Sequence, residues 1–221
     1  MTSTSTDSPG AAPGGRLGGP NLRPIEGGST LATSAARPVD PLAAELALDL
    51  DGTFERMVRE YQDRLFSFAA RVTGSREDAE EVAQDAFVRA YRALASYPAE
   101  RVRTLALKAW LYRITLNLAR NRLRGKKPRF VSIETWQAED DPSERPDALL
   151  HRRRERADLS TLVARLPERY RNPIVLRYVE GLRVEEVATI LKQPLGTTKS
   201  NLHRAVNALR DAITESRRVG R

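Results

Sequence analysis

The segment 108-KAWLYRITLNLARNRLRGKK-127 has the apolar spacing of an amphipathic helix. At 100° per residue, the side chains that share one face lie within about 40° of one another and form a stripe that a helix would bury: Leu107, Leu111, Ile114 and Leu118. The segment also holds seven basic residues and no acidic one, although soluble helices usually mix the two signs. It therefore predicts a helix with one buried face and an unmixed positive surface.

A second strip of this helix lies next to the apolar stripe and combines an aromatic ring, an amide and three guanidinium groups: Trp110, Arg113, Asn117, Arg120 and Arg124. Cations suit phosphates and planar groups suit bases, so the strip favours nucleic acid. Two other interpretations stay open from this helix alone. In the first, the basic residues near the helix C-terminus complement the helix dipole, and Trp110, beside the apolar stripe, is simply a core residue. A membrane-surface helix is the other, but it would require bulky apolar residues at the exposed edge.

The whole chain of 221 residues is basic, with 37 Lys and Arg against 29 Asp and Glu, and the charge is unevenly spread. Residues 101–130 hold ten basic and no acidic side chains, whereas residues 131–150 hold one and six. Such a pattern fits a polyanionic partner or a membrane surface. No cysteine is present, which excludes disulfides and thiolate metal sites. Because the chain lacks a membrane-length apolar run and a secretory signal, we expect a cytoplasmic protein.

The periodicity predicts an all-α fold of two small helical domains joined by a flexible linker, with no convincing strand. Residues 1–50 are rich in Gly, Pro, Ser and Thr, and we expect a disordered N-terminal tail there, with room for a short helix around Leu42–Leu50. The first domain covers 51–125, an acidic linker 126–154, and the second domain 155–216. Inside the first domain, Gly74 is expected to end one helix and Ser75 to cap the next.

The segment 183-RVEEVATILKQPLGTTKSNLHRAVNAL-209 has the form of a helix-turn-helix. The first helix would pack through Val187, Ala188 and Leu191, and the second through Leu202, Val206, Leu209 and Ile213. The opposite face of the second helix is polar and basic, as in a helix that enters the major groove of DNA: Ser200, His203, Arg204 and Asn207, flanked by Lys199 and Asn201. A plain helical hairpin with a solvated face remains the alternative from this block alone.

Two blocks of the chain together resemble a known family. The segment 166-LPERYRNPIVLRYVEGLRVEEVATILKQPLGTTKSNLHRAVNALR-210 resembles region 4 of bacterial extracytoplasmic-function (ECF) sigma factors of RNA polymerase. The segments 78-DAEEVAQDAFVRAYRAL-94 and 108-KAWLYRITLNLARNRLR-124 resemble their region 2. The resemblance implies a factor that binds core RNA polymerase, recognises the −35 and −10 promoter elements and helps to melt DNA.

The resemblance also implies roles for matching positions. The segment that docks on core RNA polymerase would use Asp78, Glu81, Gln84, Asp85 and Phe87. Tyr97 would capture a base flipped from the −10 element, and Trp110, Arg113 and Asn117 would meet the melting DNA. The basic helix adds Lys108, Arg120 and Arg124 to this −10 set. The −35 element would be read by Lys199, Ser200, Asn201, His203 and Arg204. Departures from the family pattern are Leu107 for Phe, Lys192 for the turn glycine, Thr198 for Val and Asn201 for Arg.

The partners implied are core RNA polymerase, double-stranded promoter DNA, the melted −10 strand and an anti-sigma factor, with no cofactor and no small-molecule substrate. The acidic linker is expected either to enter the positively charged polymerase channel or to be a solvated tether. An enzyme is not expected, because the two histidines are far apart and the sequence has no Gly-rich phosphate loop or metal-ligand spacing. The alternative function is a helix-turn-helix transcriptional regulator that binds DNA without polymerase.

Overall fold

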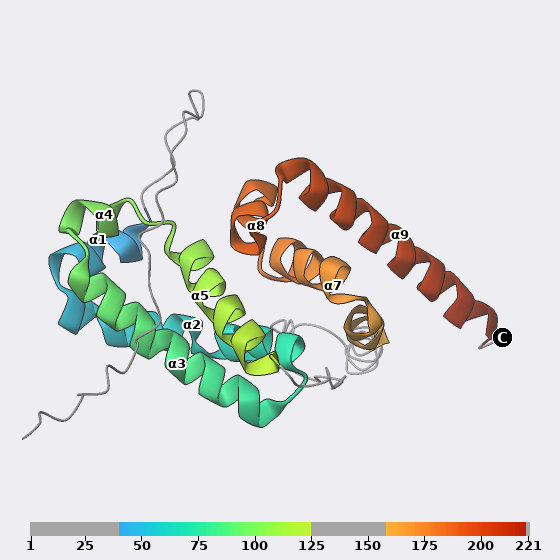
Figure 1. Cartoon of the computed structure of the whole chain (residues 1–221), viewed down its shortest axis with the longest axis horizontal. Coiled ribbons are helices and arrows are strands. Elements are labelled where there is room, and N and C mark those ends of the chain that lie inside the picture. Colours follow the sequence, from blue (N-terminus) through green and yellow to red (C-terminus); the bar gives the residue numbers. More distant parts are fainter. Residues whose placement is uncertain (1–39, 125–157, 220–221) are drawn as a thin grey trace, which may run out of the picture. The chain divides into compact units, whose positions relative to one another are not determined.

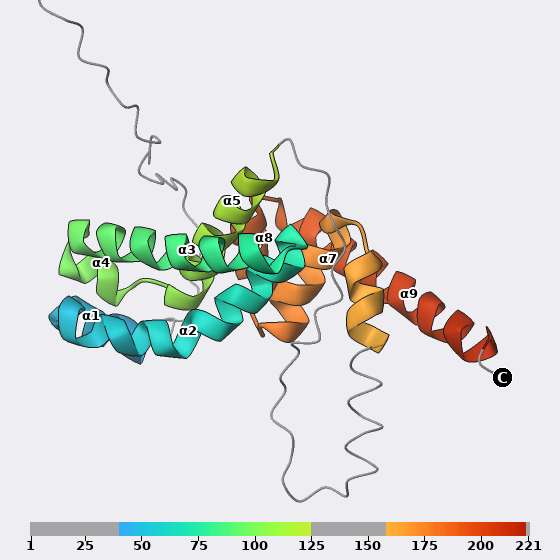
Figure 2. The same cartoon turned by 90° about the horizontal axis from the view of Figure 1, so that it is seen from below.

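The computed structural model describes residues 40–124 and 158–219, which form helices and contain no strand. The first helical block consists of α1 (Pro41–Leu48), α2 (Leu50–Thr73), α3 (Arg76–Ser96), the short α4 (Ala99–Arg103) and α5 (Leu107–Leu123). Figures 1 and 2 show α2, α3 and α5 side by side, with α1 next to α2 and α4. The prediction of an all-α fold is confirmed for the described residues.

The second helical block begins in a helix that includes residues 158–165. It continues through α7 (Glu168–Ile174), the π-helix η1 (Val175–Val179), α8 (Val184–Leu191) and α9 (Leu195–Val219) (Figure 1). The acidic linker predicted at residues 126–154 lies outside the described residues.

Helix ends follow the local sequence. Gly74 ends α2 in the left-handed conformation, with φ 68° and ψ 22°, which glycine adopts without a Cβ clash. The Ser75 side chain accepts a hydrogen bond from the backbone N–H of Asp78 at 3.2 Å and so caps α3. Asp49 caps α2 in the same manner, through the N–H of Gly52 at 2.9 Å. The predictions for Gly74 and Ser75 are confirmed.

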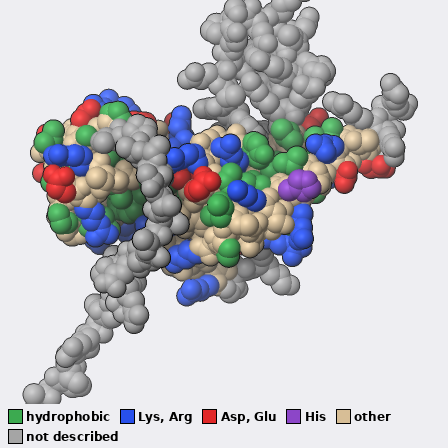
Figure 3. All heavy atoms as spheres, turned by 90° about the horizontal axis from the view of Figure 1, so that it is seen from above, with side chains coloured by type: hydrophobic (Ala, Val, Ile, Leu, Met, Phe, Trp, Pro, Cys, Tyr) green, Lys and Arg blue, Asp and Glu red, His purple; other side chains and the backbone are tan. Residues whose placement is uncertain are grey.

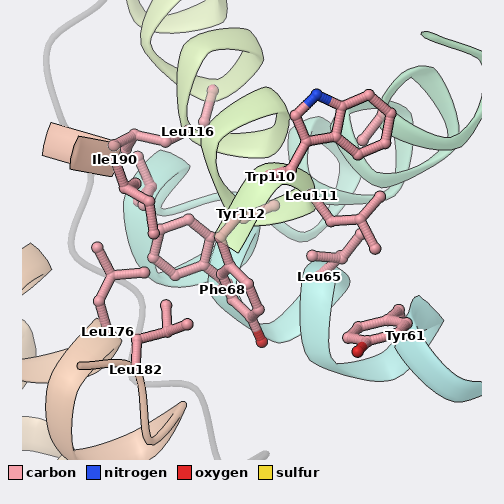
Figure 4. Packing of buried hydrophobic residues seen from close by; sticks show 14 of the residues in the cluster. Tyr61, Leu65, Phe68, Trp110, Leu111, Tyr112, Leu116, Leu176, Leu182 and Ile190 are labelled. Carbon is pink, nitrogen blue, oxygen red and sulfur yellow. The ribbon is translucent and has the colours of Figure 1, made fainter. Parts of the chain in front are cut away.

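The core of the first block is packed where α2, α3 and α5 meet. The rings of Phe68 on α2 and Tyr112 on α5 pack edge to face, with centroids 5.1 Å apart (Figure 4). Leu65 and Leu111 are fully buried beside them, and Ala86 of α3 is also completely buried. Small buried residues on α3, such as Ala86 and Ala90, take up little space between it and the other two helices. This core fixes the outward faces of α3 and α5, which carry the predicted functional residues.

Helix α5 is buried over a wider arc than its sequence predicts. Leu107, Leu111 and Leu118 of the predicted stripe are buried, while Ile114 is only half-buried. The additional buried side chains are Trp110, Tyr112, Thr115, Leu116 and Ala119. Because α8 packs against α5, a second side of the helix is covered, and a single-stripe analysis cannot anticipate that contact.

The helix-turn-helix is formed by α8 and α9. Val187, Ala188 and Leu191 are buried as predicted, together with Ile190. Lys192 ends α8 with φ 55° and ψ 47°, the left-handed conformation that a glycine would accept more readily. Pro194 immediately precedes α9 rather than lying inside its first turn.

The described helices begin with α1, in the region where a short helix was expected around Leu42–Leu50. Helix α1 (Pro41–Leu48) confirms that expectation, and the preceding part of the predicted tail lies outside the described residues. Leu42, Ala43 and Leu46 are buried, and the Asp40 carboxylate accepts the N–H of Leu42 at 3.0 Å. The packing of α1 against α2 and α4 offsets the conformational entropy that this segment loses when it becomes ordered.

The role of α1 in stability can be tested with two leucines of the same helix. Leu46 is buried at 3% exposure, whereas Leu48 is 80% exposed. Leu46→Ala removes packed methyl groups and should lower the free energy of unfolding by about 2–4 kcal/mol in urea titrations. Leu48→Ala makes the same chemical change on the surface and should leave stability within about 0.5 kcal/mol of wild type. Equal stability of the two variants would mean that α1 does not pack in solution.

Candidate nucleic-acid interface

An aromatic and cationic cluster lies where α3 ends and α4 begins. Tyr97 is the C-cap of α3 and its ring is half-buried. The Arg101 guanidinium of α4 sits over this ring, 3.7 Å from the centroid, which is a cation–π contact. The Trp110 ring of α5 lies 6.3 Å from the Tyr97 centroid at an angle of 59°. Three elements therefore converge on Tyr97.

The strip of α5 that was predicted to meet nucleic acid is exposed in part. Asn117 and Arg124 are exposed, and Arg113 is half-buried near Tyr97 and Arg101. Burial lowers the pKa of Arg113, the Tyr97 hydroxyl acts in the opposite direction, and the positive charge of Arg101 lowers it further. A cation held beside another cation in a partly desolvated position gains from a nearby anion such as phosphate.

Trp110 was predicted to lie on the surface strip that meets nucleic acid, but its side chain is buried. It is only 6% exposed and belongs to the core cluster. Its ring therefore supports Tyr97 instead of offering a free face, which agrees with the core interpretation left open above. In this structure the accessible ring of the pair is Tyr97.

Two further members of the predicted −10 set make contacts within the chain. The Lys108 ammonium donates to the backbone oxygen of Glu180, and burial lowers the pKa of Lys108. The Arg120 guanidinium pairs with the Glu168 carboxylate at 3.1 Å. Glu180 also accepts the Tyr112 hydroxyl and is buried. Lys108 and Arg120 would have to leave these partners before they could contact DNA.

The second candidate surface is the N-terminal half of α9. Lys199, Ser200, His203 and Arg204 are all exposed there, as predicted. The opposite side is buried through Leu202 and Ala205, with Val206 and Leu209 half-buried. Figure 3 shows the histidine of the described residues on the surface, with Lys and Arg side chains nearby. The helix thus offers a continuous polar and basic face that no part of the described chain covers.

Asn201 lies apart from this exposed face. It is only 9% exposed, and its side-chain amide donates to the Gln193 amide oxygen at 3.3 Å. Thr198, one turn earlier, is fully buried, and its hydroxyl donates to the Pro194 backbone oxygen at 3.2 Å. Both side chains form hydrogen bonds with residues of the turn between α8 and α9 and so stabilise it. Asn201 was predicted to be one of the residues that read the −35 element, but its side chain points towards the loop between α8 and α9.

Helix α3 carries the predicted polymerase-docking residues, which have two different environments. Glu81, Gln84 and Asp85 are exposed, whereas Asp78 and Phe87 are buried. Next to the exposed residues, Val88 is 48% exposed and Tyr91 is 39% exposed. These two apolar residues on the surface were missed, although an apolar side chain outside the core stripe was the available signal. The result is a mixed acidic and apolar surface on α3.

Arg122 of α5 pairs with two members of the predicted docking set, the buried Asp78 and the exposed Glu81. Its guanidinium contacts the Asp78 carboxylate at 2.7 Å and the Glu81 carboxylate at 2.5 Å. The hydrogen bond to Asp78 raises the pKa of Arg122, and Glu81 acts in the same direction. The pair joins the start of α3 to the end of α5. Asp78 is therefore a structural residue in this fold.

Two family models match the chain, in the order expected from the resemblance. The model of Sigma-70 region 2 matches residues 57–129, and the model of Sigma-70 region 4 matches residues 156–209. The first match includes α3, α5 and the Tyr97 cluster, and the second includes α7, η1, α8 and most of α9. Both candidate surfaces thus fall inside matched regions.

Curated relatives are similar over most of the folded chain. RNA polymerase sigma-H factor of Pseudomonas aeruginosa is 33% identical over 72% of this chain and 86% of its own length. ECF RNA polymerase sigma factor SigW of Bacillus subtilis is 32% identical over 73% of this chain and 89% of its own. ECF RNA polymerase sigma-E factor of Escherichia coli is 33% identical over 72% and 86%, respectively.

Solved structures share the fold at lower sequence identity. CnrH in complex with the cytosolic domain of CnrY superposes with a TM-score of 0.54 at 24% identity, covering 79% of this chain and 96% of that one. The sigma factor RpoE in complex with the anti-sigma factor NepR from Bartonella quintana gives 0.55 at 24% identity, covering 73% and 96%.

The described parts of the chain lack two other kinds of site. Within residues 40–124 and 158–219, no helix is long and apolar enough to cross a membrane. Over the same ranges, no three His, Cys, Asp or Glu side chains lie close enough together to bind a metal ion.

The structural role of Asp78 separates it from Asp85 on the same helix. Asp78→Asn removes a charge that is paired with Arg122 in a partly buried position, so the free energy of unfolding should fall by about 1–2 kcal/mol. Asp85→Asn makes the same change at an exposed position and should leave it unchanged. Chemical denaturation of both variants at neutral pH measures the difference. An Asp78→Asn variant as stable as wild type would show that the ion pair contributes nothing.

Proposed function

The chain belongs to the ECF group of the sigma-70 family, so it binds core RNA polymerase and directs promoter-specific transcription initiation, and we propose which of its residues perform each step. The assignment divides the two helical blocks between two promoter elements. It also assigns α3 to binding of another protein, core RNA polymerase, and not to binding of DNA.

Polymerase docking is assigned to the exposed surface of α3. Glu81, Gln84 and Asp85 supply polar and acidic groups, and Val88 supplies an exposed apolar contact beside them. Interfaces commonly combine an apolar centre with a polar rim, and this surface has both components. Asp78 and Phe87 support it from inside, because both side chains are buried.

Capture of the melted −10 strand is assigned to Tyr97 and the neighbouring strip of α5. A half-buried ring at the end of a helix offers a stacking surface, and the buried Trp110 lies next to it. Stacking of one base on an aromatic side chain is worth about 1–3 kcal/mol, which offsets the few kcal/mol that base flipping costs. Arg113, Asn117 and Arg124 lie along the adjacent helix and supply cations and an amide for the strand.

Recognition of the −35 element is assigned to the exposed face of α9. Lys199, Ser200, His203 and Arg204 occupy the N-terminal half of the second helix of a helix-turn-helix, the part that contacts base edges in the major groove. Arginine can pair bidentately with guanine, so Arg204 is the strongest candidate for direct base recognition. Asn201 is assigned to the turn instead of the groove.

The observation that supports this function most directly is the Tyr97 cluster beside the cationic helix α5. A helix-turn-helix regulator that acts without polymerase has no use for an aromatic ring placed among cations in a separate helical block. The match of that block to Sigma-70 region 2 also goes against the regulator alternative. The second block alone would be compatible with either function.

The partners follow from this assignment. Core RNA polymerase and promoter DNA act in the bacterial cytoplasm, and we place the chain there. Two structural neighbours are sigma factors or related proteins in complexes, one of them with the anti-sigma factor NepR. We therefore propose that an anti-sigma factor also binds this chain. The role is a binding one, with no catalytic residue, cofactor or small-molecule substrate assigned to the protein.

Tyr97 provides the test of −10 capture. Tyr97→Ala should slow open-complex formation on a duplex promoter and make the open complex less stable by about 1–3 kcal/mol. The affinity for core polymerase should not change. Tyr97→Phe keeps the ring and should behave like wild type. On a template with a pre-melted −10 bubble the Tyr97→Ala defect should be smaller, because the melting cost is already met. Full activity of Tyr97→Ala on the duplex promoter would rule out stacking on this ring.

Arg204 and Arg113 should differ in the kind of contact that they make. Arg204→Ala should lower initiation and relax base preference at one −35 position, with about 1–3 kcal/mol less discrimination. Arg113→Ala should weaken DNA binding on all promoters and flatten its salt dependence by about one phosphate contact. The measurement is holoenzyme binding to −35 single-base variants at several salt concentrations. If Arg204→Ala weakens every variant by the same factor, Arg204 contacts phosphate and does not read sequence.

A further inference from the structure

The loop between α3 and α5 contains a helix that places a cation on the candidate stacking ring. Helix α4 has five residues, and its Arg101 guanidinium lies 3.7 Å from the centroid of the Tyr97 ring. A flat guanidinium covers an aromatic face in the manner of a stacked base. Arg101 therefore occupies a place on the ring that a captured base would compete for.

Arg101 differs from its neighbour on α4 in the way its charge is balanced. Arg103 pairs with the Glu100 carboxylate at 3.5 Å. Among the described residues, no carboxylate pairs with Arg101, whose exposed side chain contacts the Tyr97 ring. Its charge also acts on Arg113, whose pKa is lowered first by burial and additionally by Arg101. One arginine thus lies on the Tyr97 ring and a second lies close enough to feel its charge, and among the described residues no carboxylate pairs with either. This arrangement favours binding of an anion.

Helix α4 is held in place by a buried residue and by its contact with α1. Val102 is the buried residue of α4, and α4 packs against α1. The Thr104 hydroxyl donates to the Glu100 backbone oxygen at 3.0 Å and closes the end of the short helix. With Val102 anchored in the core, its neighbour Arg101 is left exposed next to the ring. Helix α4, which carries Arg101, thus packs against an element outside the region 2 match.

We propose that Arg101 is a further DNA-binding residue of the −10 site. In the free protein its guanidinium covers Tyr97; when a base stacks on the ring, the guanidinium transfers to the backbone phosphate of the melted strand. Guanidinium groups pair with phosphate through two parallel hydrogen bonds, so the cation–π contact that is lost is replaced by a charge-assisted one. This inference rests on the proposed role of Tyr97 in capturing the −10 strand.

The test compares Arg101→Gln with Arg103→Gln, two charge removals on the same short helix. Holoenzyme is assembled from core RNA polymerase and each full-length variant. Its affinity is then measured for a fluorescent single strand carrying a −10 element that has been mapped by run-off transcription. Arg101→Gln should bind about 3- to 10-fold more weakly at low salt, and its log–log salt slope should be smaller by about 0.7, the value for one phosphate of a single strand. Arg103→Gln should match wild type in both.

A third variant separates charge from folding. Arg101→Lys keeps the positive charge and should restore the salt slope, although a lysine lacks the planar, two-point contact. Circular dichroism spectra and core affinity, which should be unchanged for all three variants, establish that α4 and the docking surface are intact.

The outcomes distinguish this inference from the function on which it rests. If wild-type holoenzyme binds the strand and Arg101→Gln shows the same affinity and salt slope, Arg101 only covers the ring and the inference is wrong. Tighter binding by Arg101→Gln would also overturn it, because the guanidinium would then be a competitor of the base and nothing more. If wild-type holoenzyme does not bind the strand at all, the proposed −10 function itself fails.

Discussion

The edge-to-face contact between Phe68 and Tyr112 is the packing interaction on which the first helical block depends. It fixes α2 against α5 in a core where Leu65 and Leu111 are completely buried. Helix α3 closes this core through small residues such as Ala86 and Ala90. Once these three helices are packed, the outward side of α3 and the cationic strip of α5 have fixed orientations. The functional surfaces are therefore a consequence of how the core is assembled.

The cationic surface has an electrostatic cost that the fold must offset. Arg113 is half-buried near a second arginine, and both burial and Arg101 lower its pKa, so its charged state is less favourable there than in water. The same block neutralises a different arginine, Arg122, with Asp78 and Glu81. In contrast, among the described residues no carboxylate pairs with Arg101 or Arg113 near the Tyr97 ring, and the nearby Glu100 pairs with Arg103. An anionic strand would relieve the repulsion at that ring, which links the cost in the free protein to affinity for DNA.

Features governed by local periodicity could be predicted from the sequence. The buried positions Leu107, Leu111 and Leu118, the Gly74 stop and the Ser75 cap all depend on neighbours within a few residues. The turn at Lys192 was also located correctly, even though a lysine in the left-handed conformation carries some strain. The exposed face of α9 followed from the same helical spacing.

Features that depend on distant contacts could not be predicted in this way. A short helix was expected around Leu42–Leu50, but the packing of α1 on α2 and α4 could not be read from the sequence. Trp110 is drawn into the core by tertiary contacts, and Asn201 is held by Gln193, which precedes α9. Arg101 could not be identified from the sequence, because its proposed role depends on its contact with the Tyr97 ring.

The joint action of both helical blocks on core polymerase is the main feature of the proposed function. It is tested most directly by mapping run-off transcripts from a genomic fragment library with core polymerase alone, the chain alone and both combined. We expect specific start sites only in the combined reaction, and weak, unselective binding of the free chain to duplex DNA. Tight binding of the free chain to specific DNA sites, without new start sites when polymerase is added, would contradict it.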